Sequence, residues 1–257
     1  MSIEQTVYYQ QVGQGEAFVL LHGWGVNSAI WQPVIEQLSQ HFTLFIVDLP
    51  GCGKSAPLDC YSLENICHEI MKVVPETAIW CGWSLGGLIA TYAAINHSTR
   101  VNKLIQVSSS VKFVADDLWA GVSSDVFTHF LAGLTENAQK TLTRFIALQA
   151  MGSVSARKDT VVIKKLLAGT PEANHEALVA GLTLLSESDL RLSFSDLTVP
   201  CLSLFGRFDS LIPVQIQQDT RSLLPSVHSF MFESSSHAPF ISETELFCQK
   251  VIEFSCD

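Results

Sequence analysis

The sequence predicts an α/β chain with a mostly parallel central sheet flanked by helices and an inserted all-helical block. Short apolar segments alternate with segments of helical periodicity up to about residue 110, and the alternation returns after Pro200. Between residues 111 and 190 only the helical periodicity remains. We therefore expect one core, formed by residues 1–110 and 191–257, with a helical lid at residues 111–190 inserted in it.

The composition is that of a compact globular protein. Of the 257 residues, 47% are hydrophobic and 16% are charged, which excludes an intrinsically disordered chain. The formal net charge of -10 argues against a nucleic-acid partner. No apolar run approaches the roughly 20 residues of a membrane span, and the first residues lack the basic and apolar regions of a signal peptide. We expect a cytoplasmic protein with no membrane partner.

The cysteines indicate a reducing compartment. The chain has seven of them, an odd number, and no two form a Cys-x-x-Cys pair. Free thiols fit this pattern best, and a zinc site does not.

The first two apolar runs, residues 7–12 and 18–21, are predicted to be strands. Gly13-Gln14-Gly15 stands between them and provides turn residues, so we expect the two strands to form a hairpin. Further strands are expected at residues 42–47, 77–81, 101–107, 201–205 and 228–232. Core helices are expected at residues 28–40, 61–74, 85–96, 214–224 and 243–254, the first of them capped by Asn27 or Ser28.

A glycine-rich loop, His22-Gly23-Trp24-Gly25, follows the second strand. Such a loop can turn a backbone N–H, that of Trp24, toward a neighbouring strand end. Paired with the N–H of Leu85, it would form an oxyanion hole, the pair of donors that acyl transfer requires. His22 lies at the strand end itself, where an orienting or packing role is expected rather than that of a base.

The segment after the third strand, residues 48–55, ends in Gly-Lys-Ser as a phosphate-binding loop does. The phosphate-loop pattern requires a glycine at position 48, where this chain has Asp48. We interpret the segment as a structural turn.

Ser84 is the candidate nucleophile. It is the central residue of Gly82-Trp83-Ser84-Leu85-Gly86, which joins an apolar strand directly to a helix. A serine in such a turn adopts a strained backbone, and glycines on either side avoid clashes with neighbouring segments. The geometry is that of a nucleophile elbow. Taken alone, the same residues also fit an ordinary strand-to-helix turn.

Asp209 and His237 complete a candidate catalytic triad. Asp209 follows the strand at residues 201–205, and His237 lies in the loop after the strand at residues 228–232. Carboxyl ends of parallel strands share one edge of a sheet, so both side chains are expected near Ser84. The order Ser, Asp, His is the one that this type of sheet requires.

The predicted lid carries helical patterns at residues 125–134, 135–151, 156–168 and 171–185. Between residues 140 and 165, the lid contains six basic residues and a single acidic residue, Asp159. This basic island is either a solvated helix face or a docking surface for an anionic partner near the pocket mouth. Its members are Lys140, Arg144, Arg157, Lys158, Lys164 and Lys165.

Together these motifs resemble the α/β-hydrolase superfamily across the whole chain. A closer resemblance, to the biotin-synthesis carboxylesterases that hydrolyse pimeloyl-acyl carrier protein methyl ester, adds segments of the core and the lid. These segments are His22–Gly25, Ala78–Trp80 with Gly82–Gly87, Arg144–Gln149 with Met151-Gly152, and His237–Ser242. The lid segment distinguishes this family from the rest of the superfamily, because the elbow is shared by many unrelated activities.

The resemblance implies a cytoplasmic, monomeric esterase without metal or cofactor, whose partner is an acyl carrier protein bearing a pimeloyl methyl ester. It implies a triad of Ser84, Asp209 and His237. The implied substrate-binding residues are Trp24, Ser84, Leu85, Phe145, Ile146, Ala147, Leu148, Gln149 and His237. One departure concerns carrier docking, since Val161 stands where the family can have a basic residue.

Other activities of the α/β-hydrolase fold make different demands on these residues. A haloalkane dehalogenase needs aspartate at the elbow, and Ser84 excludes it. A hydrolase-fold receptor without activity usually lacks one triad member. A broad-range short-chain carboxylesterase and a carbon–carbon bond hydrolase share the triad and remain alternatives.

Overall fold

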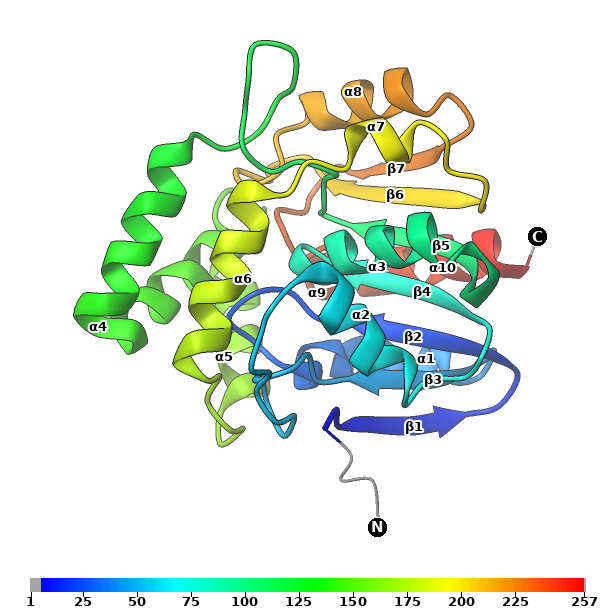
Figure 1. Cartoon of the computed structure of the whole chain (residues 1–257), viewed down its shortest axis with the longest axis horizontal. Helices are drawn as coiled ribbons and strands as arrows, with labels where there is room; N and C mark the ends of the chain where they lie inside the picture. The colour runs from blue at the N-terminus through cyan, green and yellow to red at the C-terminus, as the bar shows by residue number, and fades with distance from the viewer. Residues whose placement is uncertain (1–5, 257) are drawn as a thin grey trace.

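The computed structural model describes residues 6–256. Seven strands form one sheet in the order β1-β3-β2-β4-β5-β6-β7 (Figure 1). Every neighbouring pair is parallel except β1 with β3, which confirms the mostly parallel sheet that the sequence predicts. The strands are β1 (Tyr9–Gly13), β2 (Glu16–Leu21), β3 (Phe42–Val47), β4 (Ala78–Trp83), β5 (Val101–Val107), β6 (Cys201–Gly206) and β7 (His228–Phe232).

The expected hairpin between the first two strands is wrong. β1 pairs with β3 in antiparallel register, and β2 lies between β3 and β4. The reason is that β2 uses both of its edges for parallel partners, so β1 pairs with the outer edge of its neighbour β3. Gly13 and Gly15 have positive φ angles of 90° and 117°, and they carry the chain across the start of β3 instead of turning it back on itself.

Each face of the sheet is covered by its own group of helices. Alternate residues of β2 separate the two cores: Val19 and Leu21 belong to one, and Phe18 and Leu20 to the other. The first core packs under α2 (Leu63–Met71), α3 (Leu85–Asn96), α7 (Arg191–Phe194) and α8 (Gln215–Leu223). The second packs under the 3-10 helix η1 (Ser28–Trp31), α1 (Gln32–Leu38), α9 (Pro239–Ser242) and α10 (Thr244–Cys256).

Residues 111–190 form a helical insertion with α4 (Ser124–Ala150), α5 (Ala156–Leu167) and α6 (His175–Glu187). None of the described residues in this range belongs to a strand of the sheet, and only isolated bridges occur there. The sequence predicts two helices that meet after residue 134. In the structure α4 likewise consists of two helices, and they meet at Asn137, whose dihedral angles are non-helical (φ -161°, ψ 93°).

The two ends of the insertion are joined by ion pairs. Lys112 contacts Asp116 at 2.6 Å and Asp189 at 3.4 Å, and Arg191 contacts the same two carboxylates at 2.9 and 2.6 Å. These four residues hold the first and last segments of the insertion together. The helices of the insertion lie together at one end of the sheet (Figure 1).

All seven cysteines carry free thiols, as the sequence predicts, and five of them are buried. Among residues 6–256, no helix is long and apolar enough to cross a membrane.

Candidate active site

Ser84 lies between β4 and α3 in a strained backbone conformation, with φ 53° and ψ -117°. A Cβ atom on Gly82 would overlap the carbonyl of Gly86, and one on Gly86 would overlap that of Leu21. The two glycines are therefore required for close approach, as the sequence predicts. Ser109 Oγ, at the end of β5, donates to the Ser84 carbonyl at 2.8 Å and holds the turn against the neighbouring strand.

The loop after β2 runs beside Ser84. A Cβ atom on Gly23 would lie 3.2 Å from Ser84 Cβ, so the loop is in contact with the turn. The backbone N–H groups of Trp24 and Leu85 make no hydrogen bond with any of the described residues. Leu85 is also the first residue of α3, where the helix dipole favours negative charge. Both predicted oxyanion donors are thus free.

His22 supports this loop from within the core. The N–H of Leu49 donates to His22 Nε2 at 2.9 Å, so the ring proton is on Nδ1, which donates to the Gly23 carbonyl at 2.8 Å. The side chain is fully buried, and this burial lowers the pKa of His22 although Asp48 opposes the effect. With both ring nitrogens in use, His22 has the orienting role that its position predicts.

Asp48 and the turn that follows it are structural. The Asp48 carboxylate accepts hydrogen bonds from Ser28 N and Lys54 N, both at 2.8 Å, and thereby closes the segment that ends in Gly-Lys-Ser. A Cβ atom on Gly53 would overlap this carboxylate. The backbone donors that a phosphate loop would present are here used by the protein itself.

Asp209 and His237 come together at the same edge. His237 Nδ1 lies 2.8 Å from Asp209 Oδ2, and the other carboxylate oxygen accepts from the N–H groups of Leu211 and Ile212 at 2.8 and 2.9 Å. His237 Nε2 is buried and has no partner among the described residues. Next to Ser84, the Trp83 indole donates to the His237 carbonyl at 2.7 Å, which brings the histidine loop against the serine turn.

An inner pocket of about 30 Å³ opens onto Ser84. Apart from Ser84 it is lined by apolar side chains, mostly from the insertion, so α4 and α6 cover the carboxyl edge of the sheet. Of the lining residues the sequence reasoning named only Ser84 and Phe145. Those it missed include Phe127, Phe130, Leu182, Leu185 and Leu211. The spacing of three between Phe127 and Phe130 was a signal, but it does not distinguish a pocket wall from helix packing.

The predicted binding segment, Phe145–Gln149, does not present one common wall. Phe145 lines the inner pocket and packs edge-on against Trp24, with ring centroids 4.7 Å apart. Ile146 faces a different cavity, and Ala147 is exposed. Leu148 is half-buried, and the buried Gln149 amide has no partner among the described residues. The substrate-binding role of the segment stays a prediction.

A hydrogen-bonded seam joins the insertion to the histidine loop. The His237 N–H donates to the Gln149 carbonyl at 3.0 Å, and Ser236 Oγ donates to the Met151 carbonyl at 2.9 Å. Asp159 of α5 is buried and accepts hydrogen bonds at 2.8 to 2.9 Å from three hydroxyls, those of Ser153, Ser155 and Ser242. Ser242 ends α9, directly after the histidine loop.

The basic island is exposed on α4 and α5. None of its six members forms an ion pair with another described residue. Val161, on the same surface, is 65% exposed. Within residues 6–256, no cluster of three or more His, Cys, Asp or Glu side chains is arranged to hold a metal ion.

Comparison with known proteins places this geometry in a family. Residues 16–244 match the family model of the alpha/beta hydrolase fold. The pimeloyl-[acyl-carrier protein] methyl ester esterase of Vibrio cholerae is 49% identical over 97% of this chain and 98% of its own. The enzyme of the same name from Aliivibrio fischeri is 41% identical over 96% of both chains.

Solved structures share the fold at lower sequence identity. An esterase from Exiguobacterium antarcticum superposes with a TM-score of 0.85 at 22% identity, over 98% of this chain and 96% of that one. An enol-lactonase from Burkholderia xenovorans also reaches 0.85, at 19% identity over 98% and 96%. At this level of identity, these structures show only that the fold is shared. By fold and by full-length similarity, the chain belongs to the α/β-hydrolase family and, within it, to the pimeloyl-[acyl-carrier protein] methyl ester esterases.

Proposed function

We propose that this protein is a serine carboxylesterase that hydrolyses the methyl ester of pimeloyl-acyl carrier protein, releasing methanol. The observation that carries the proposal is the 41–49% identity, over nearly the full length, to relatives that bear this name. The enzyme works as a cytoplasmic monomer without metal or cofactor. Its residues 111–190 act as a lid over the acyl chain.

Ser84 is the nucleophile of the proposed mechanism. Its Oγ attacks the ester carbonyl carbon while His237 Nε2 accepts the hydroxyl proton. His237 Nε2 is buried and has no hydrogen-bond partner among the described residues, which supports this role. Asp209, 2.8 Å from Nδ1, keeps that nitrogen protonated and stabilises the imidazolium that forms.

The tetrahedral intermediate places its oxyanion between the N–H groups of Trp24 and Leu85. Loss of one such donor costs about 3 to 4 kcal/mol in comparable enzymes. Collapse of the intermediate breaks the bond to the methoxy oxygen, which leaves as methanol with the proton from His237. Water then attacks the acyl-enzyme with His237 as base, and the second collapse frees the carboxylic acid and restores Ser84.

The basic island receives the carrier. Acyl carrier proteins are acidic, and an enzyme with net charge -10 repels them unless a local surface reverses the field. Six exposed cations that form no ion pair within residues 6–256 provide such a surface on α4 and α5. Charges of this kind act mainly on the rate of encounter.

The test compares substrates and a nucleophile variant. We expect the purified protein to hydrolyse the carrier-bound methyl ester with a higher kcat/KM than p-nitrophenyl acetate or butyrate. Ser84→Ala should lower kcat by about 10⁴-fold to 10⁶-fold, because the acyl-enzyme cannot form. Ser98→Ala, at an exposed serine beyond α3, is the matched control and should keep full activity.

Two results would contradict the proposal. Equal kcat/KM values for the carrier-bound ester and the short esters would indicate a broad-range carboxylesterase instead. More than about 1% residual turnover in Ser84→Ala would remove Ser84 as the nucleophile.

A further inference from the structure

The carbonyl oxygen of Ser84 accepts three hydrogen bonds. The N–H groups of Gly87 and Leu88, in the first turn of α3, donate to it at 2.9 and 3.1 Å, and Ser109 Oγ donates to it at 2.8 Å. The backbone donors are those that a helix ordinarily supplies to the carbonyl that precedes it. The hydroxyl of Ser109 is an additional donor, and it comes from the segment that follows β5. Ser84 and Ser109 are both buried, so this contact is shielded from solvent.

The peptide unit that carries this carbonyl also carries the N–H of Leu85. That N–H is one of the two donors proposed for the oxyanion hole. A hydrogen bond accepted by a peptide oxygen draws electron density from the nitrogen of the same unit, and its N–H becomes a stronger donor. Linked hydrogen bonds in a protein interior strengthen one another by about 10–30% per bond. The Ser109 hydroxyl is therefore placed to strengthen an oxyanion donor through the Ser84–Leu85 peptide.

Ser109 reaches the Ser84 carbonyl because the backbone before it is strained. Within residues 6–256, Ser84 and Ser108 are the two residues other than glycine with positive φ angles, 53° and 42°. Side chains alternate along β5, so that Leu104 belongs to the core under α3 and Val107 to the core on the opposite face. A continued strand would place Ser109 on the face of Val107. The left-handed conformation of Ser108 breaks the alternation and turns Ser109 toward α3.

The Ser108 side chain does not compensate for this strain. Its hydroxyl is buried and has no hydrogen-bond partner among the described residues. The residue that gains a contact from the turn is Ser109, and α3 leaves room for it at Gly87, where a Cβ atom would lie 2.5 Å from both Cβ and Oγ of Ser109. Strained residues of this kind persist where the surrounding structure holds them, and they cluster at functional sites.

From these observations, and resting on the proposed function, we propose that Ser109 is a positioning residue of the oxyanion hole, which polarises the Ser84–Leu85 peptide and fixes the direction of the Leu85 N–H. When Ser84 Oγ attacks the ester carbonyl carbon, its proton passes to His237 Nε2 and the ester oxygen gains a negative charge. The polarised N–H stabilises this charge more than it stabilises the neutral ester. Ser109 therefore acts on kcat and not on the binding of substrate.

The experiment removes a single oxygen atom. Ser109→Ala keeps the Cβ atom that packs beside Gly87 and deletes only the hydroxyl. Ser110→Ala, at the next position, is the matched control. Ser110 is equally buried, and its Oγ likewise donates to a backbone carbonyl, that of Lys112, at 2.6 Å. Both variants are assayed with dimethyl pimelate and with the carrier-bound methyl ester.

We expect Ser109→Ala to lower kcat about two- to eightfold on both esters, with KM changed less than about twofold. Loss of a whole oxyanion donor costs about 10²-fold to 10³-fold in kcat, and the hydroxyl supplies about 10–30% of the strength of one donor. Ser110→Ala should keep the kcat of the wild type, although denaturation should show a similar loss of stability in both variants. The acid limb of the pH profile should stay in place, since neither hydroxyl hydrogen-bonds to Asp209 or His237.

A mimic of the oxyanion distinguishes the hole from the rest of the site. An alkyl trifluoromethyl ketone adds Ser84 Oγ to its carbonyl carbon, the serine proton passes to His237, and the former carbonyl oxygen carries the charge in the hole. In Ser109→Ala, the inhibition constant of the ketone should rise by the factor by which kcat/KM falls, and Ser110→Ala should leave it unchanged. A lower kcat with an unchanged inhibition constant would overturn the proposal. So would wild-type kinetics in Ser109→Ala, or an equal loss of kcat in Ser110→Ala.

The outcomes separate this inference from the proposed function. If Ser84→Ala keeps its turnover, the proposed mechanism is wrong and the oxyanion hole with it. If Ser84→Ala is inactive and Ser109→Ala behaves like the wild type, only the role of Ser109 is wrong. If the wild-type protein hydrolyses dimethyl pimelate but not the carrier-bound ester, the proposed substrate is wrong, and dimethyl pimelate still tests Ser109.

Discussion

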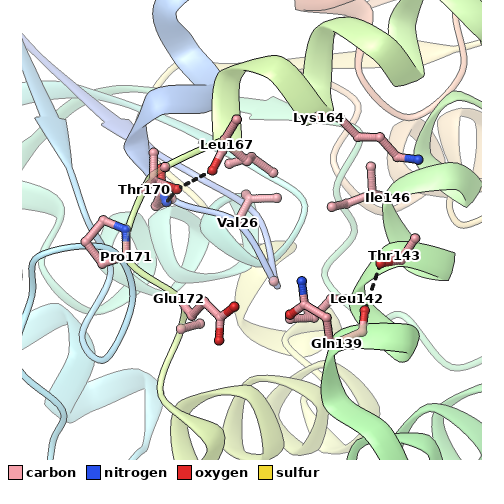
Figure 2. Close-up of a pocket in the computed structure, with 15 residues that line it drawn as sticks. Val26, Gln139, Leu142, Thr143, Ile146, Lys164, Leu167, Thr170, Pro171 and Glu172 are labelled. Carbon is pink, nitrogen blue, oxygen red and sulfur yellow. Dashed lines mark hydrogen bonds between the residues drawn. The ribbon is translucent and has the colours of Figure 1, made fainter.

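The sheet edge and the helical insertion solve opposite problems within one site. At the sheet edge, His22, Ser84, Asp209 and His237 are each at most 6% exposed, and glycines bring backbone into direct contact with backbone. On the insertion, the six cations of the basic island are exposed and form no ion pair with another described residue. A cavity, which we name the outer cavity, lies between α4, α5 and the loop after β2 and is lined by residues of all three (Figure 2). Chemistry needs atoms held within fractions of an ångström, whereas docking a carrier tolerates an adaptable surface.

The two regions meet at the seam around Asp159. Its carboxylate holds the start of α5 to the helix that follows His237, through Ser242. Arg157 and Lys158 of the basic island are its neighbours in sequence. At this end, therefore, the insertion shares the rigidity of the sheet edge, and the adaptable part lies at the opposite end of α5, beside the outer cavity.

The largest effect on stability is expected from removing the Asp159 carboxylate, which breaks the seam. Asp159→Ala leaves three hydroxyls without their acceptor, and we expect a loss of about 2 to 3 kcal/mol in the free energy of unfolding. If Asp159 also positions His237, kcat should fall about tenfold on every ester while KM changes little. Chemical denaturation and steady-state kinetics at a temperature where the variant is folded measure the two effects.

Two companion variants separate positioning from stability. Ser242→Ala removes only the link to the histidine loop, so it should reproduce part of the fall in kcat at a smaller cost in stability. Asp117→Ala removes a carboxylate of the same charge from an exposed position and should change neither quantity. A kcat that stays at the wild-type value in Asp159→Ala would reduce the seam to a purely structural contact.

A smaller effect is expected from the buried histidine of the sheet edge. Burial lowers the pKa of His22 below its unfolded value of 6.5, so the unfolded chain binds a proton more readily than the native one. Stability is then fully present above about pH 6.5 and is lost as the pH falls from there toward the lowered pKa, by at most 1.36 kcal/mol per pH unit. Denaturation between about pH 7.5 and pH 5.5 measures this slope.

His22→Gln should flatten the slope, since glutamine does not titrate. The same change at exposed His41 serves as the control and should leave the slope as it is in the wild type. If both variants kept the wild-type slope, the pH dependence would come from other groups.

Sequence reasoning succeeded where the signal is local. The strands at residues 42–47, 101–107 and 228–232 have the predicted bounds, because each is an apolar run between breakers. The approach of Asp209 to His237 followed from chain order, because neighbouring parallel strands end at one edge.

Sequence reasoning failed where the structure depends on packing between segments that are distant in the chain. The pairing of β1 was missed because it depends on strands that come later in the chain: β3 and β4 occupy both edges of β2, and β1 pairs with β3. The pocket wall of Phe127, Phe130 and Leu182 depends on how α4 and α6 pack together. In the sequence, Asp159 is simply the one acidic residue of a basic stretch. The fold shows that its side chain is a hydrogen-bond acceptor that is only 3% exposed.

The smallest effect on the fold is expected from the island itself. Reversing Arg144 and Arg157 to glutamate should leave stability unchanged, because exposed charges without partners contribute little to it. We expect kcat/KM for the carrier-bound ester to fall by about five- to tenfold and to lose much of its salt dependence, since rim charges act on encounter. Dimethyl pimelate carries no charge and should react at the wild-type rate.

A control with the same change in net charge locates the effect. Lys72→Glu with Arg221→Glu alters two cations outside the insertion and should affect the carrier-bound ester only slightly, because screening confines each charge to about 8 Å at physiological salt. Equal losses in both double variants would mean that net charge, not the island, governs encounter. Unchanged kinetics in the Arg144 and Arg157 variant would leave the island as a solvated helix face, and the adaptable surface of the insertion would then be its outer cavity alone.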